Sequence, residues 1–121
     1  MSVSIGNLAL DPQQIHAGTT SVNLTYEGFV TQASDNDVDL TFSICPNDTN
    51  IFIVDDKGKN VKSISYSQTF KVGAPPGDLS KSIKFIVLNA PAQPVICVVE
   101  LVATTANGTD SDKASGNISY S

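Results

Sequence analysis

The sequence alternates apolar and polar residues in short runs, and this period of two predicts β-strands rather than helices. In the clearest run, residues 37–45, Val38, Leu40, Phe42 and Ile44 share one phase and polar residues occupy the other. Similar runs lie at residues 3–8, 20–27, 51–54, 61–72, 80–88, 95–105 and 116–120. No segment carries the apolar stripe of an amphipathic helix. We therefore predict seven to eight short strands and an all-β domain.

Turn residues separate these runs, and composition agrees with a turn-rich chain. Ten of the twelve acidic residues are Asp, which favours turns, and only two are Glu. The run 95–105 is apolar in both phases, as expected for a central strand covered on both faces. This favours a two-sheet sandwich over a barrel. With 121 residues the chain has the length of one domain, which we place at residues 1–121.

The order of the turn motifs resembles that of a known family. Leu10-Asp11-Pro12, then Ala17-Gly18 and a Val-x-Leu-x-Tyr strand at 22–26, resemble the entry to bacterial immunoglobulin-like domains. The last part, an apolar strand running into residues 106–111 (Ala-Asn-Gly-Thr-Asp-Ser), is similar to the end of such domains. The resemblance implies an immunoglobulin-like two-sheet antiparallel sandwich and a general role in adhesion or assembly. It assigns no individual residue a function.

The charge pattern excludes several classes of partner. The net charge is −5, all seven basic residues are Lys, and Arg is absent. Nucleic-acid binding relies on cationic groups that neutralise phosphates, so this chain is a poor candidate. Binding to an anionic membrane is disfavoured for the same reason, and the acidity itself favours solubility.

The sequence gives little information on localisation. No stretch approaches the ~18 apolar residues of a membrane-spanning helix. The first ten residues lack the basic and apolar regions of a secretory signal. Localisation thus stays open between a cytosolic protein and a mature or exported fragment.

Catalytic signatures are weak, and we predict that the protein is not an enzyme. The single histidine, His16, lies in a loop, where it is expected to be an ordinary polar residue. A Ser-His-Asp triad would need a carboxylate to orient it and a hydroxyl beside it. No nucleophile elbow, phosphate-binding loop or dinucleotide fingerprint occurs.

The two cysteines allow two states. Cys45 and Cys97 are expected at the same end of neighbouring antiparallel strands, which would permit a disulfide. Alternation, however, places Cys45 outward with Asp39 and Thr41, and Cys97 inward with Val99. Side chains on opposite faces do not meet disulfide geometry, unless a bulge shifts one register. Free thiols are therefore favoured, and a disulfide is the alternative.

A cofactor is not required by any motif, but one acidic segment is a candidate Ca²⁺ site. Asp35, Asp37 and Asp39 alternate at the entry to a strand, and closely spaced carboxylates are ligands that Ca²⁺ prefers. The segment lacks the glycine and distal glutamate of the helix–loop–helix calcium motif. The alternative is a solvated, turn-rich loop.

The outward face of the run 95–105 is the most informative anomaly. Ile96, Val98 and Val102 should point away from the core if Cys97 and Val99 point inward. Exposed apolar patches mark contacts, so these residues are a candidate interface with a protein partner or a second copy. The alternative is that a loop of the same chain, 73–78 or 90–94, covers them.

Two functions follow as hypotheses from the sequence. The first is a non-enzymatic protein-interaction or structural module. The second is a calcium-assisted ligand-binding domain, for example for carbohydrate, that uses the loops at one end of the sandwich. The absence of Trp, the most favourable aromatic surface for a sugar, argues against the second.

Overall fold

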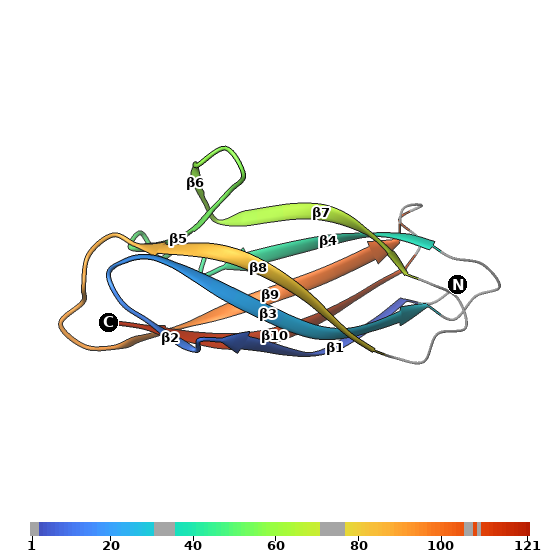
Figure 1. Cartoon of the computed structure of the whole chain (residues 1–121), viewed down its shortest axis with the longest axis horizontal. Helices are drawn as coiled ribbons and strands as arrows, with labels where there is room; N and C mark the ends of the chain where they lie inside the picture. Colours follow the sequence, from blue (N-terminus) through green and yellow to red (C-terminus); the bar gives the residue numbers. More distant parts are fainter. Residues whose placement is uncertain (1–2, 31–35, 71–76, 106–107, 109) are drawn as a thin grey trace.

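Ten strands make up the fold of the computed structural model, which describes residues 3–30, 36–70, 77–105, 108 and 110–121 (Figure 1). They are β1 (Val3–Asp11), β2 (Gln14–Ile15), β3 (Gly18–Val30), β4 (Asn36–Ile44), β5 (Ile51–Val54), β6 (Asn60–Val61), β7 (Ser63–Phe70), β8 (Gly77–Val87), β9 (Val95–Thr105) and β10 (Ser111–Tyr120). The described residues form no helix long and apolar enough to span a membrane.

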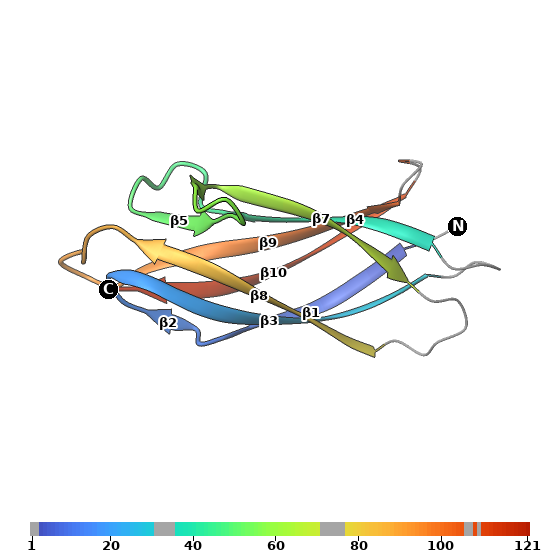
Figure 2. The ribbon, with the colours of Figure 1, turned by 45° about the horizontal axis from the view of Figure 1, so that its top comes forward.

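The strands form two five-stranded sheets that pack face to face. One sheet has the order β1-β3-β8-β5-β6 and the other the order β2-β10-β9-β4-β7. Neighbouring strands are antiparallel, except that β2 runs parallel to β10. The predicted two-sheet sandwich is confirmed, and the two-residue strands β2 and β6 add to the longer ones that alternation predicted. Figure 2 shows the two layers and their twist.

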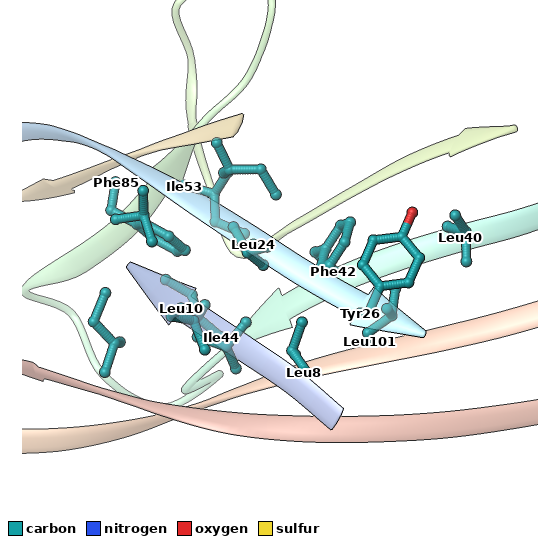
Figure 3. Packing of buried hydrophobic residues seen from close by; sticks show 14 of the residues in the cluster. Leu8, Leu10, Leu24, Tyr26, Leu40, Phe42, Ile44, Ile53, Phe85 and Leu101 are labelled. Carbon is teal, nitrogen blue, oxygen red and sulfur yellow. The ribbon is translucent and has the colours of Figure 1, made fainter. Parts of the chain in front are cut away.

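The core lies between the sheets and follows the predicted alternation. On β3, Val22, Leu24 and Tyr26 are buried, and on β4 so are Leu40 and Phe42. Figure 3 shows the side chains of both sheets meeting in this layer. At ~25 cal/mol per Å² of apolar surface removed from water, such a core is the main stabilising contribution.

One lateral side of the sandwich, where β1 meets β10, is closed by unusual contacts. The backbone N–H groups of Val3 and Ile5 donate hydrogen bonds to the carboxylates of Asp110 and Asp112, respectively. These bonds satisfy donors at the free edge of β1. Gly116 of β10 lets the chains approach closely, because a Cβ there would lie 2.8 Å from the carbonyl oxygen of Leu8. The edge of β1 is thus covered by the same chain.

Cys45 and Cys97 form a disulfide, so the preference for free thiols was wrong. Their Cα atoms are 5.7 Å apart, within the usual range for a bridge. Cys97 is inward and fully buried, as predicted. The error lay in Cys45, because β4 ends at Ile44 and a turn begins at Cys45, whose carbonyl accepts from the N–H of Asp48. Alternation therefore no longer fixes the direction of that side chain.

Strand β9 also differs from expectation. It is central in its sheet, between β10 and β4, and its inward residues Cys97, Val99, Leu101 and Ala103 are buried. Its outward face, however, is not covered as the two-phase apolar pattern predicted. This face carries the candidate interface residues described next.

Candidate functional site

The outer face of the β9 sheet exposes two adjacent apolar side chains. Ile96 is 71% exposed and Val98 is 51% exposed. Their cross-strand neighbours on β10 are Ser119 and Asn117, both polar. The 90–94 loop does not bury either apolar side chain. The alternative loop, 73–78, lies partly outside the described residues.

The third candidate interface residue, Val102, lies further along β9 and is half-buried. It stands between Thr41 of β4 and Lys113 of β10 in the sheet. The exposed apolar surface is therefore concentrated at Ile96 and Val98, which we call the β9 apolar pair. Val102 is at most at its margin.

Beyond β9, the same outer face is a ladder of hydroxyl and carboxylate groups on β4 and β7. Thr41 Oγ1 and Ser65 Oγ are 2.8 Å apart. The hydroxyl of Ser67 donates to Asp39 at 3.0 Å, and that of Thr69 donates to Asp37 at 2.7 Å. These cross-strand pairs stabilise the pairing of β4 with β7.

Two of the three candidate Ca²⁺ ligands, Asp37 and Asp39, belong to this ladder. Asp37 and Asp39 are exposed and point the same way on β4, as alternation predicted, and each already accepts a hydrogen bond from β7. Asp35 lies outside the described residues. Within the described part of the chain, no three His, Cys, Asp or Glu side chains come together as a metal site would need. The Ca²⁺ site stays a prediction.

A groove of about 600 Å³ opens on the lateral side opposite the β1–β10 contact. It lies where β5 ends, between the start of β7 and the middle of β8, and sequence reasoning did not find it. Its wall is formed by Ile64 and Tyr66 of β7 and by Lys81 and Ile83 of β8, with Asp55 at one end. The groove thus combines apolar and aromatic groups with two lysines, Lys81 and Lys84, and two carboxylates, Asp55 and Asp56.

Tyr66, which lines this groove, belongs to an aromatic cluster that continues into the core. The Tyr66 ring stacks on Phe42 at 5.9 Å, and Tyr26 meets Phe42 edge-on at 6.1 Å. The hydroxyls of Tyr26 and Tyr66 are 2.7 Å apart. Burial raises the pKa of the Tyr66 hydroxyl, and the hydrogen bond with Tyr26 raises it further. Both hydroxyls therefore stay neutral at physiological pH.

A cation faces the same cluster. The ammonium of Lys81 lies 4.4 Å from the centre of the Tyr66 ring, a distance typical of a cation–π contact. Lys81 occupies the inward phase of β8, where its neighbours Ile83 and Phe85 are buried. No carboxylate of the described residues forms an ion pair with it.

A second polar cluster lies at the end of the sandwich where the chain terminates. The Tyr120 hydroxyl donates to the Asp48 carboxylate. Burial and this hydrogen bond raise the pKa of Tyr120 to about 12. For Asp48, burial acts to raise the pKa, but the hydrogen bonds from Tyr120 and Asn50 and the charge of Lys62 outweigh it and lower the pKa. This cluster fixes the C-terminal strand against the turn after β4.

The single histidine lies nearby but is not part of a triad in the described structure. His16 is exposed, and its Nδ1 is 3.0 Å from the Ser121 hydroxyl. Its contacts offer no carboxylate to orient the ring, which a Ser-His-Asp arrangement needs.

Comparison with known proteins supports the fold. No family model and no curated protein matches the chain. A cohesin module from a Clostridium perfringens family 33 glycoside hydrolase is similar over 98% of this chain and 96% of its own, with TM-score 0.50 and 8% identity. The N-terminal domain of PorA is similar with TM-score 0.51 and 12% identity, over 98% and 86% of the two chains.

A third solved structure spans more than the present chain. The sporulation control protein Spo0M from Bacillus subtilis is similar with TM-score 0.52 and 17% identity. The match covers 98% of this chain but only 49% of Spo0M. At these identities the likeness concerns the fold alone. The chain therefore has a β-sandwich fold found in bacterial modules, while membership of the bacterial immunoglobulin-like family stays a prediction.

Proposed function

We propose that this chain is a non-enzymatic protein-interaction or assembly module, and that its contact surface is the outer face of the β9 sheet. The observation that carries the proposal is the exposure of the β9 apolar pair, Ile96 at 71% and Val98 at 51%. Both lie in the part of β9 that extends beyond β4, where β10 is the strand that pairs with it. Contiguous exposed apolar groups favour a contact site.

The surroundings of the pair are consistent with an interface. The cross-strand neighbours of the pair on β10 are the polar Asn117 and Ser119. The next outward residue on β9 is the acidic Glu100, which lies opposite Ser43 of β4. Interfaces typically have an apolar centre with few charges and a polar rim. A sheet face of this kind fits a flat surface on a protein partner or on a second copy.

The disulfide bears on where such a module would act. Disulfides form and persist in oxidising compartments and are rare in the cytosol. The Cys45–Cys97 bridge therefore favours an exported module over a cytosolic one.

Native mass measured by light scattering across a concentration series tests the assembly form of the proposal. We expect a dimer or larger species that Val98→Lys weakens at least tenfold, since a buried lysine without a partner disfavours the contact. Asn23→Lys is the matched control, because it adds the same charge at an exposed position on β3 of the other sheet. A wild-type chain that stays monomeric, or equal effects of the two lysines, would refute self-assembly through the β9 apolar pair.

A further inference from the structure

The edge of β8 is only partly covered by a neighbouring strand. β3 pairs with β8 along its whole length, whereas β5 pairs only with Lys84–Val87. Figure 2 shows β5 beside the end of β8 that carries the arrowhead. Among the described residues, 77–83 therefore have a strand partner on one edge only.

The hydrogen-bond pattern identifies which backbone groups point to this open edge. The N–H of Leu88 donates to the carbonyl of Asn50 at 2.8 Å, so these opposite residues form a hydrogen-bonded pair. In an antiparallel ladder such residues alternate along the strand. The N–H and C=O groups of Ser82 and Ser80 therefore point to the same side as those of Leu88, beyond the end of β5. An extended chain placed there could pair with them.

Burial along the strands matches this incomplete cover. On β8, Phe85 and Val87 are fully buried beside β5, whereas Lys81 and Leu79 are only half-buried beyond it. Tyr66 of β7, across the gap between the sheets, is also only half-buried. These inward side chains surround the groove of about 600 Å³. A segment continuing the line of β5 would cover them.

The two outer edges of the same sheet, at β1 and β6, are protected. The edge of β1 is bonded to Asp110 and Asp112 and interrupted by a register shift. β6 is two residues long and is flanked by Lys59 and Lys62. Short edges, bulges and lysines are the usual means of preventing unwanted strand pairing. The open stretch of β8 has one such device, the inward-pointing Lys81 between Ser80 and Ser82. An added strand without a carboxylate would bury this charge unpaired.

We propose that this groove binds an extended segment of a partner protein, which pairs with the open edge of β8 and places an acidic side chain on Lys81. The proposal deepens the interaction role proposed above, on a surface separate from the β9 apolar pair. Strand addition supplies affinity through main-chain hydrogen bonds and specificity through alternate side chains. The Lys81 ammonium, over the Tyr66 ring and without an ion-pair partner in the described structure, supplies the preference for a carboxylate.

Charge argues against a second copy as the occupant. The edge of β1 is already bonded to Asp110 and Asp112, which leaves β7 as the long edge strand available for pairing in the described structure. Its sequence, Ser-Ile-Ser-Tyr-Ser-Gln-Thr-Phe, contains no acidic residue. A β7 from another copy would bring no carboxylate to Lys81. The partner is thus a different protein, with one acidic residue in an extended segment that is otherwise uncharged and alternates apolar and polar residues.

Synthetic heptapeptides with blocked ends test the proposal. The probe is Thr-Val-Thr-Glu-Thr-Val-Thr with a fluorescent label, and the matched peptide carries Gln in place of Glu. Binding is measured by anisotropy, and the site by amide NMR shifts of the ¹⁵N-labelled chain. We expect shifts confined to residues 79–84 and 63–66, and about fivefold tighter binding of the Glu peptide.

Variants and modified peptides separate this binding from adsorption. Lys81→Gln should remove the preference for Glu over Gln, whereas Lys113→Gln, an exposed lysine on β10, should leave it intact. Two further peptides carry N-methyl groups on alternate residues, in opposite phases. Only one should lose binding, because only one edge of the added strand faces β8.

Several results would overturn the proposal. They are an absence of shifts at the groove, equal binding of the two N-methylated peptides, or a Glu preference that survives Lys81→Gln. Ser82→Pro removes a donor that points to the open edge without breaking a bond to β3. If this variant instead dissociates a dimer, the occupant is a second copy and the partner segment is refuted. None of these results depends on Val98→Lys, so the two proposals fail separately.

Discussion

Reducing the Cys45–Cys97 disulfide should destabilise the fold strongly. The two cysteines are 52 residues apart in sequence. In the chain-entropy model, opening a loop of this size costs about 4 kcal/mol at 25 °C, since the unfolded chain regains the freedom that the bridge removed. With an m-value of ~2 kcal/mol per M, this loss lowers the urea midpoint by about 2 M.

Urea unfolding followed by circular dichroism, with and without dithiothreitol, measures this effect. The double variant Cys45→Ala/Cys97→Ala is the control, because its midpoint should not respond to the reductant. Wild-type protein should lose stability on reduction and approach the double variant. The remaining difference between them reports the packing of the Cys97 sulfur, which is fully buried.

The reasoning fails if the oxidised and reduced wild-type proteins unfold at the same midpoint. It fails equally if a thiol reagent labels the unfolded, unreduced protein at two positions, because the bond would then not be formed. A loss well under 1 kcal/mol with the bond present would mean that the unfolded chain is already compact around the two cysteines.

Three further predictions concern other parts of the molecule. Gly116→Ala should cost ~1–3 kcal/mol, because its Cβ would lie 2.8 Å from the Leu8 carbonyl oxygen, whereas Gly6→Ala, with nothing within 4 Å, should cost little in the same urea assay. Tyr120 has its pKa raised from 10.0 to about 12, so its contribution to stability is present below pH 10 and lost as pH rises towards 12; Tyr120→Phe should flatten this part of the urea–pH profile. Calorimetric titration with Ca²⁺ should give heat that is lost on changing residues 35, 37 and 39 to Asn, and an absence of heat in the wild type refutes the Ca²⁺ site.

Alternation predicted the sandwich because burial in these sheets is one-sided. Wherever a strand has one face on the core and one on solvent, its inward residues are apolar, as Val38, Leu40 and Phe42 illustrate on β4. The same logic identified the outward position of Ile96 and Val98, since Cys97 and Val99 had to point inward. Alternation could not decide whether a loop of the same chain or a partner covers these outward side chains.

Errors arose where long-range contacts rather than local pattern set the structure. β10 begins at Ser111, five residues before the predicted start, although the residues 111–115 include only one apolar side chain. Its ladder with β9 and the bonds from Asp112 to β1 define that segment. The predicted direction of the Cys45 side chain was wrong for a related reason, because β4 ends at Ile44, one residue before it. The local sequence pattern does not show these partners, which are β9 for residues 111–115 and Cys97 for Cys45.

The groove, by contrast, left a signal in the sequence that alternation can detect. The inward phase of β8 contains Ile83, Phe85 and Val87, and the next position in that phase is Lys81. A lysine in phase with core residues is costly to bury, so its position indicates where the cover of the core ends. The fold places this change where β5 stops, at Val54. A charged residue within the apolar phase of a strand can therefore indicate, from the alternation pattern alone, where a neighbouring strand ends and a sheet edge is open.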